Sequence, residues 1–553
     1  MGAEPPAGYL VIAVQNKFTR RFLRWAGVIL VIFYVGFALV DGPVWAKDSA
    51  SYTGMTIGRE PVYPLFLAFF RMIFGEEAGR NGLSAYLFPA VIVQSLVNAY
   101  AVWVLVKAVL NGVAGESEGM GTMTNLLLAA LAGDFHLIVA LLNRFAAGRG
   151  SMYSEAILTE SLAMPLYLIF VVRLWETYSK NLPLEGEGDR LRWRRCHTIR
   201  LAILAFLLIG LRKQMAVVLL LWGVVAVVDC FRKCIKGTGE SEGTGTMTHF
   251  SLRGEQPALP EEKRVIVPVP LTHLLLTVTS IIIVLLAGNG FERAYNAAVH
   301  DRAVPHTGNG KGLMCTLLYS ADPDEDAVFF QNCQTGGLCE LFTDILATCD
   351  DMGILKKNLD EGSARYYISA DGQQVEGAVF ENTGSWLDLG EHYAASYDII
   401  GYEVCDPMIT EYLAERGFTG VDAEIAYDTI ASEFNRVLMK QKKGDLIRVF
   451  CVNFIKGLVA TNARIHPALV PVSLLLYVLY VVMYIVLGKN TLHFAEITFL
   501  AILINTGVVG LMIFPQPRYM IYNMGLFYTA LAMMSFMLYS KVWITKKRTK
   551  EKS

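Results

Sequence analysis

The amino-acid sequence predicts an all-α polytopic membrane protein with about ten transmembrane helices and a separate domain outside the cytoplasm. The chain of 553 residues is 54% hydrophobic and only 18% charged, whereas soluble chains are about 25% charged. Its apolar residues also fall in blocks of about 18–25, the length that a helix needs to cross the hydrocarbon of a bilayer. Only helices and closed barrels satisfy their backbone groups in lipid, and continuous apolar blocks lack the alternation of barrel strands.

The apolar blocks define ten expected spans along the chain. They cover residues 23–44, 84–107, 123–145, 156–175, 198–211, 214–231, 267–288, 468–488, 494–514 and 522–543. We interpret the fifth and sixth spans as a hairpin that turns at Arg212 and Lys213, because two charges at the centre of one long helix would be unfavourable in lipid. The chain therefore divides into a transmembrane core, a polar outer domain and C-terminal spans, over 1–290, 291–465 and 466–553.

Basic residues lie unevenly around these spans. With ten spans, four basic segments fall on one side of the membrane: the N-terminal segment, the loop 176–197, the segment that begins at Arg232 and the C-terminal tail. Lysine and arginine in short loops mark the cytoplasmic side. We expect both termini in the cytoplasm, the active site outside it, and a bacterial plasma membrane rather than an endoplasmic reticulum. No cleavable signal is expected, because the first basic residues lead into a full-length span.

Charge and local composition argue against other functions. The net charge of −2 and the lack of a long basic run disfavour a nucleic-acid partner. Two nearly identical decapeptides, GESEGMGTMT from Gly115 and GESEGTGTMT from Gly239, have the composition of flexible linkers. A nucleotide-binding loop is disfavoured at both, because no strand precedes them and no GKS or GKT follows.

The outer domain is expected to be mainly α or α+β. Helical patterns run from Ile409 to Arg416 and from Glu424 to Lys440, and the length of about 175 residues is enough for an independent core. Six of the nine cysteines fall in this domain: Cys315, Cys333, Cys339, Cys349, Cys405 and Cys451. Because the number is even and the compartment permits disulfides, we predict disulfides with the pairing left open, and we disfavour a zinc site because no CxxC pair occurs.

The first outer loop, residues 45–82, carries an acidic residue followed by an amphipathic run. The segment 62–74 is too short to span a membrane and contains Arg71, so short interfacial helices are expected here. Asp48 has two interpretations. It is either the N-cap of a helix that begins at Ser49, since aspartate is favoured there, or a general base at the membrane–water boundary.

Several motifs share the expected outer face of the membrane. They are Asp48-x-x-x-Tyr52, Gly58-x-x-Pro61-x-Tyr63-Pro64, Phe74-Gly75, Leu158-Thr159-Glu160-Ser161-Leu162-Ala163, Arg212-Lys213 and Pro517-Arg518-Tyr519-Met520. In order and spacing they resemble GT-C glycosyltransferases, the polyprenyl-phosphate-sugar-dependent enzymes related to protein mannosyltransferases and lipid A aminoarabinose transferases. The resemblance covers residues 1–230 and 494–553, and it does not extend to the outer domain. The family's Thr and Pro are absent around Arg212, and its final Pro is absent after Met520.

The resemblance implies an inverting single displacement with Asp48 as the general base and Asp41 as the second candidate. It also implies a substrate site made of Arg59, Tyr63, Glu160, Arg212, Lys213, Arg518 and Tyr519. The residue types suit this chemistry, because the planar fork of arginine binds two phosphate oxygens at once. In the alternative interpretation, basic residues at span ends only anchor the chain in the interface. Glu155 and Glu160 either orient an acceptor, bind a divalent ion or cap helices, and we favour capping.

The expected function is transfer of a sugar from a polyprenyl-phosphate donor, of undecaprenyl or dolichyl type, to a glycan, lipid or protein acceptor of the cell envelope. No soluble cofactor is implied, and the need for a divalent cation stays open. The acidic string 322–326 lacks the ligand spacing and the glycine of a calcium loop. The rival functions are a transporter or flippase of lipid-linked glycans, which would use Asp134 and His136 in the third span, and a non-catalytic envelope assembly protein.

Loops that are far apart in the chain are expected to meet outside the lipid and form one pocket. Asp48 lies on one wall of this pocket, and the positive charges of Arg212 and Arg518 lie on the other.

Overall fold

Helices make up nearly the whole fold in the computed structural model. The structure describes residues 7–116, 122–145, 150–179, 187–239, 269–330, 337–367, 377–439, 443–466, 468–488 and 493–552. Within these ranges the only strands are the two-residue β1 (Arg365–Tyr366) and β2 (Ala378–Val379), which pair antiparallel. The predicted all-α class is confirmed. The two decapeptides predicted to be linkers fall mainly outside the described residues.

In the described part of the chain, eight helical segments are long and apolar enough to cross a membrane. They lie in α1 (Ala7–Asp41), α4 (Leu87–Glu116), α5 (Thr122–Phe145), α8 (Val217–Gly239), α9 (Val269–His300), α18 (Leu469–Leu487), α19 (His493–Met512) and α21 (Met524–Lys552). The other two expected spans form α6 (Glu160–Tyr178) and α7 (Glu187–Leu211), which carry more charge. The membrane class is confirmed, and the count of ten spans stays a prediction.

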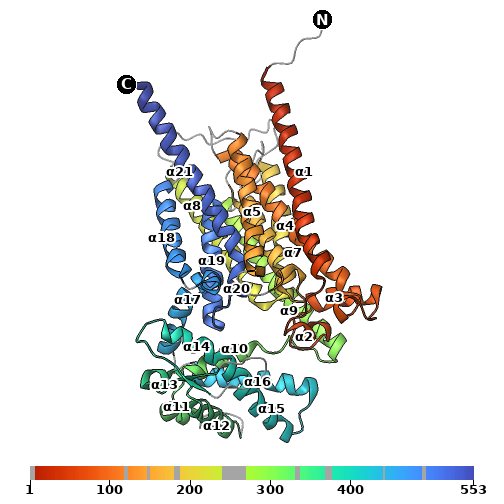
Figure 1. Cartoon of the computed structure of the whole chain (residues 1–553), viewed down its shortest axis with the longest axis vertical. Helices are drawn as coiled ribbons and strands as arrows, with labels where there is room; N and C mark the ends of the chain where they lie inside the picture. The colour runs from red at the N-terminus through yellow and green to blue at the C-terminus, as the bar shows by residue number, and fades with distance from the viewer. Residues whose placement is uncertain are drawn as a thin grey trace, which may run out of the picture.

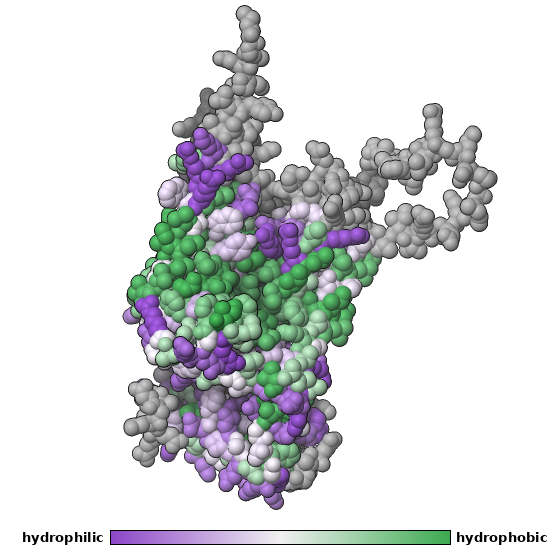
Figure 2. All heavy atoms as spheres, turned by 90° about the vertical axis from the view of Figure 1, so that its right-hand side faces the viewer, coloured by the Kyte–Doolittle hydropathy of each residue, from purple (hydrophilic) through white to green (hydrophobic). Residues whose placement is uncertain are grey.

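The long helices share a band of hydrophobic surface. Figure 2 shows this band across the helices, with hydrophilic residues gathered above and below it. Large apolar side chains are exposed on α9 and α18, among them Ile283, Leu286, Leu475 and Ile485. Because soluble proteins rarely expose contiguous apolar patches larger than a few hundred Å², the band is the surface that lipid covers.

Two helices organise the bundle. Helix α4 packs against α1, α5 and α6, and its close approach to α6 depends on Gly112, where a Cβ atom would lie 2.5 Å from the ring of Trp175. Helix α19 packs against α6, α8 and α21, with the rings of Phe494 and Trp175 4.8 Å apart. The N-terminal and C-terminal segments therefore share one core.

A smaller helical domain lies at one end of the long helices, opposite the end where α1 begins and α21 ends (Figure 1). It contains α10 (Asn309–Tyr319), α11 (Pro323–Phe330), α12 (Leu338–Asp351), α13 (Lys356–Glu361), α14 (Asp388–Ile399), the π-helix η4 (Ile400–Cys405), α15 (Asp406–Glu415) and α16 (Gly420–Leu438). Tyr319, Phe342 and Phe434 are buried in its own core. The helices predicted from Ile409 and from Glu424 are confirmed as α15 and α16. Helix α17 (Lys443–Ile465) leads back to the bundle.

The structure forms no disulfide among the described cysteines of the outer domain, contrary to the prediction. All eight described cysteines are free, and Cys333 lies outside the described residues. Cys315, Cys349 and Cys405 are buried in the apolar core of the outer domain, where a thiol packs as a small hydrophobic group. Cys451 is exposed on α17. The even number of cysteines misled the prediction, because an oxidising compartment permits a disulfide but does not bring two sulfur atoms together.

Candidate active site

Two short helices make up much of the first outer loop, as the sequence predicts. They are α2 (Ser49–Thr53) and α3 (Val62–Phe74). Between them Met55 adopts a left-handed conformation with φ of 52°, and the chain turns back on itself. Arg59 consequently lies beside α2, where its Nε donates to Ser51 Oγ at 2.7 Å.

The same loop is held against the segment that precedes α6. The backbone N–H of Val44 donates to the carbonyl of Glu155 at 3.0 Å, and the N–H of Ile157 donates to the carbonyl of Val44 at 3.0 Å. Ser49 is buried and donates its hydroxyl to the carbonyl of Ile157 at 2.9 Å. These contacts place Asp48 beside the start of α6.

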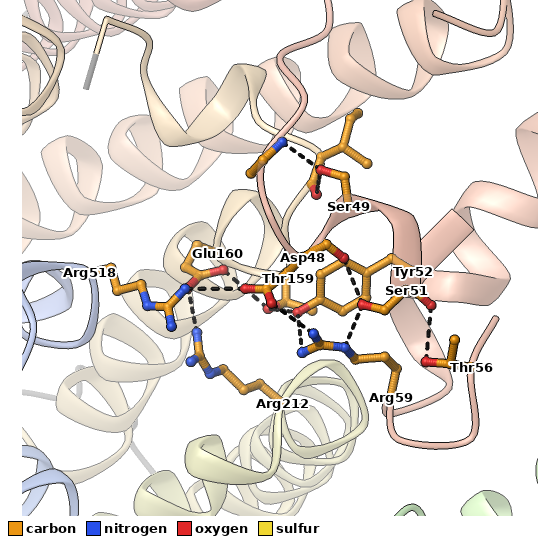
Figure 3. A network of polar contacts seen from close by, with 12 residues as sticks. Asp48, Ser49, Ser51, Tyr52, Thr56, Arg59, Thr159, Glu160, Arg212 and Arg518 are labelled. Carbon is orange, nitrogen blue, oxygen red and sulfur yellow. Dashed lines mark hydrogen bonds and ion pairs between the residues drawn. The ribbon is translucent and has the colours of Figure 1, made fainter. Parts of the chain in front are cut away.

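Asp48 stands at the centre of the polar network drawn in Figure 3. Arg59 Nη2 donates to its Oδ1 at 2.8 Å, and Arg518 Nη1 donates to its Oδ2 at 3.2 Å. Asp48 occupies the N-cap position of α2, but its side chain makes no capping hydrogen bond. The capping interpretation is therefore wrong, and the carboxylate is shared by two guanidinium groups.

A second ion pair lies next to the first. Arg212, which directly follows α7, donates to Glu160 Oε1 at 2.5 Å, and only 2% of the Glu160 side chain is exposed. Tyr52 and Thr159 connect the two pairs. Arg59 Nη1 donates to the Tyr52 hydroxyl at 3.3 Å, and Thr159 Oγ1 lies 3.4 Å from that hydroxyl and 3.3 Å from Glu160 Oε2. A carboxylate buried this deeply needs a paired cation, so Glu160 holds Arg212 in position.

The ring of Tyr519 joins the two ion pairs. Arg212 Cζ lies 4.6 Å and Arg518 Cζ 4.8 Å from its centroid, and Arg518 Nη2 also donates to its hydroxyl at 2.6 Å. Both guanidinium groups are attracted to the electron-rich ring, which offsets the repulsion between them. The short helix α20 (Pro517–Met520) supplies Arg518 and Tyr519, so the C-terminal part of the chain forms one wall of the site.

The network carries an excess of positive charge. Arg59, Arg212 and Arg518 supply three guanidinium groups, and Asp48 and Glu160 supply two carboxylates, which leaves one net positive charge. About a third of the Asp48 and Arg518 side chains is exposed (32% and 31%). The network can therefore accept one further anion from the solvent-accessible side.

Lys213 lies beside this network rather than in it. Its Nζ pairs with Glu292 of α9 at 2.9 Å, and its backbone N–H donates to Glu60 Oε1 at 2.5 Å. His306 lies 3.3 Å from Glu292 and 3.7 Å from Glu60. The turn predicted between α7 and α8 is confirmed, and its lysine belongs to a neighbouring ion-pair group.

Tyr63 is buried behind the network. Its hydroxyl accepts a hydrogen bond from Gln94 Nε2 at 2.7 Å, and its ring meets the ring of Tyr52 edge to face at 5.2 Å. Arg59 lies 4.6 Å above the ring of Tyr52. Tyr63 therefore supports the residue on which Arg59 rests.

Asp41, the second candidate base, belongs to a separate ion-pair group at the end of α1. It pairs with Arg144 of α5, which also contacts Glu155 at 3.0 Å. The backbone N–H of Met152 donates to Glu155 at 3.1 Å, so the predicted capping role of Glu155 is confirmed. Burial raises the pKa of Glu155 to about 7, and the negative charge of Asp41 adds to this shift.

The ionisable pair of the third span is split between two environments. Asp134 is exposed on α5, whereas His136 lines a cavity of about 80 Å³ inside the bundle. Residues two apart on a helix do not face each other. Tyr522 is also part of the cavity lining, and Asp48 is not.

Sequence reasoning missed several members of these groups, namely Glu60, Arg144, Thr159, Glu292 and His306. Glu60 and Thr159 had a signal, because each lies in one of the outer-face motifs directly beside a predicted site residue, Arg59 or Glu160. Arg144 and Glu292 had none, since their partners lie 103 and 79 residues away. No group of three or more His, Cys, Asp or Glu residues within the described ranges is arranged to hold a metal ion.

Comparisons with protein-family models, curated protein sequences and solved structures find no match for this chain. The arrangement of the Asp48 network is therefore the basis for a functional conclusion.

Proposed function

We propose that this chain is a membrane glycosyltransferase of the GT-C kind, which moves a sugar from a polyprenyl-phosphate donor to a hydroxyl group of a cell-envelope acceptor outside the cytoplasm. The observation that carries the proposal is the contact of Arg518 with Asp48 at 3.2 Å, in a network that also holds Arg59 and Arg212. A proton acceptor and two phosphate ligands thus lie side by side. Transfer of a sugar from a phosphate needs this combination.

The donor phosphate binds to Arg212 and Arg518 in this proposal. A sugar linked to a polyprenyl monophosphate is a phosphodiester with one negative charge, which matches the single positive excess of the network. After transfer the phosphate is a monoester with a charge of about −1.5 to −2 at pH 7. The guanidinium groups therefore bind the leaving group more tightly than the substrate, which lowers the barrier.

Asp48 acts as the base in a single displacement. The acceptor oxygen attacks the anomeric carbon from the face opposite the phosphate, and its proton passes to Asp48. The bond between the anomeric carbon and the phosphate oxygen breaks, its electron pair leaves with the polyprenyl phosphate, and the anomeric configuration inverts. When Arg518 turns to the donor phosphate it frees Asp48 Oδ2, while Arg59 keeps Oδ1 in place.

The positions of these residues in the chain support a lipid-linked donor. Helix α7 ends at Leu211, directly before Arg212, and the last apolar segment begins at Pro517, directly before Arg518. Asp48 follows the end of α1 by a few residues. The headgroup of a lipid-linked donor lies at this depth, with its polyprenyl chain in the hydrocarbon layer.

The proposal is tested with purified protein in nanodiscs, radiolabelled undecaprenyl-phosphate sugars and a membrane extract that supplies acceptors. Asp48→Asn keeps the size of the side chain and removes the base. Transfer is expected to fall by about 10²–10⁴-fold, the usual contribution of a general base, while undecaprenyl phosphate still binds. Glu381→Gln, at an exposed carboxylate of the outer domain, is the matched control and leaves both readouts unchanged.

Transfer by Asp48→Asn at the wild-type rate would remove this residue as the base. If wild-type protein in vesicles instead moves the donor across the bilayer without transferring its sugar, the chain is a transporter. The cavity lined by His136 would then be the region to examine.

A further inference from the structure

The outer domain touches both loops that supply the Asp48 network. On one side, the backbone N–H of Thr307 donates to the carbonyl of Ile57 in the first outer loop at 3.3 Å. On the other side, the hydroxyl of Tyr397 donates to the carbonyl of Met512 at 3.5 Å, a few residues before Arg518. The outer domain is therefore attached to both walls of the site.

Helix α14 ends at Ile399, two residues after Tyr397, and continues into the π-helix Ile400–Cys405. Such segments are rare and occur frequently at functional sites. The wide turn packs closely on α10, because a Cβ atom at Gly401 would lie 3.3 Å from Lys311 Cε. Tyr402, the next residue, is 61% exposed.

One face of the Tyr402 ring is covered. Lys311 Nζ lies 4.1 Å from its centroid and is held there by Asp406 at 2.6 Å. Burial raises the pKa of Tyr402, and the negative charges of Asp398 and Asp48 add to the shift. Lys311 thus occupies one side of the phenol, while much of its ring stays open to solvent.

Asp398 lies one helical turn before Tyr402 and is accessible to solvent. Among the described residues this carboxylate has no hydrogen-bond or ion-pair partner. Burial raises the pKa of Asp398, and the positive charges of Arg518, Lys47 and Lys311 act in the opposite direction. Asp398 directly follows Tyr397, which contacts Met512 in the segment before Arg518, so this carboxylate lies on the helix that borders this wall of the site.

We propose that Asp398 and Tyr402 form the acceptor subsite and that the acceptor is a carbohydrate. This inference rests on the proposed function and names its second substrate. The open face of an aromatic ring suits the C–H face of a pyranose, and a free carboxylate accepts hydrogen bonds from two neighbouring hydroxyl groups. A further hydroxyl of the bound sugar then reaches Asp48, which takes its proton.

The residue chemistry favours a sugar over the other two acceptor classes. A protein acceptor is commonly held at a strand edge or in a groove, whereas Asp398 and Tyr402 are exposed on one continuous helix. A lipid acceptor would need a contiguous apolar patch, whereas Lys311 places a charge over the ring of Tyr402 and Asp398 is exposed on the same helix.

The test uses the full chain in nanodiscs with two probes. One probe is undecaprenyl phosphate, and the other is a panel of oligosaccharides built from glucose, galactose, mannose or N-acetylglucosamine. The variants are Asp398→Asn, Tyr402→Ala and Tyr402→Phe. The control is Trp386→Ala, at a 54% exposed aromatic residue near the other end of α14.

We expect wild-type protein to bind at least one oligosaccharide of the panel. Asp398→Asn and Tyr402→Ala should weaken this binding at least tenfold, while Tyr402→Phe, which keeps the ring, stays within threefold. Binding of undecaprenyl phosphate should be unchanged in all variants, and the control should behave as wild type.

Two results would overturn the inference. One is a wild-type protein that binds undecaprenyl phosphate but no oligosaccharide of the panel. The other is oligosaccharide binding that neither Asp398→Asn nor Tyr402→Ala weakens. A wild-type protein that fails to bind undecaprenyl phosphate contradicts the proposed function instead, so the two failures are distinguishable.

Discussion

Arg518 donates a hydrogen bond to Asp48 at 3.2 Å across 470 residues of sequence. The contact arises because both residues lie near ends of apolar helices, after α1 and at α20. Helix packing brings these ends to one level of the molecule, where Arg212 at the end of α7 joins them. A charged network therefore forms from residues that would be unfavourable in the hydrocarbon layer itself.

The first prediction concerns the fork of Arg518. Arg518→Lys should lower sugar transfer and undecaprenyl phosphate binding by at least about tenfold, because an ammonium group cannot reproduce the planar, bidentate geometry of a guanidinium. Donor titrations of binding and of transfer measure both effects. Arg436→Lys, at a pair within α16, is the control, and equal affinity of Arg518→Lys and wild type would contradict the assigned role.

The second prediction concerns the pH dependence of stability through Glu155. Its pKa rises from 4.5 to about 7 in the folded protein, so between these values the folded state binds more protons than the unfolded state. Stability from this group is therefore present at low pH and is lost as pH rises through about 7. Between pH 5 and pH 8 the melting temperature of wild type should fall more than that of Glu155→Gln. An equal fall of the two melting temperatures would contradict the role of Glu155.

The third prediction concerns the contact of α4 with α6. Gly112→Ala should destabilise the protein by about 1–3 kcal/mol, the usual effect of overpacking a core, because the new methyl group meets the ring of Trp175. Gly36→Ala is the matched control, since a Cβ there meets no atom within 4 Å beyond its chain neighbours and the backbone of its own helix. Thermal unfolding in detergent compares the two variants. Equal melting temperatures would contradict the prediction, because they would show that the close contact of α4 with α6 does not contribute to stability.

The membrane helices were largely predictable, because hydropathy reports directly on burial in lipid. The expected spans 468–488 and 494–514 differ by at most two residues at each end from α18 and α19. Composition identifies α6 less clearly as a membrane span, because this helix contains the charged residues Arg173 and Glu176. The two residues pair with each other. The prediction of disulfides was wrong, because the number of cysteines does not determine the distance between their sulfur atoms.

The candidate site was predictable in part. Arg212 and Arg518 attract notice because basic residues are unusual at span ends on the expected extracytoplasmic side, and Asp48 because it follows the first expected span. Their partners are set by tertiary packing, so the pairing of Arg212 with Glu160 could not be derived from sequence alone. Asp398 and Tyr402 had no signal, since a π-helix has no recognisable sequence periodicity and the outer domain lies outside the family resemblance.

The structure of this protein with undecaprenyl phosphate bound in a nanodisc is the most direct test of the account. We expect phosphate oxygens at about 3 Å, a hydrogen-bond distance, from the guanidinium groups of Arg212 and Arg518, with Asp48 released from Arg518 and still held by Arg59. A phosphate bound away from both arginines, with the contact between Asp48 and Arg518 intact, would contradict it.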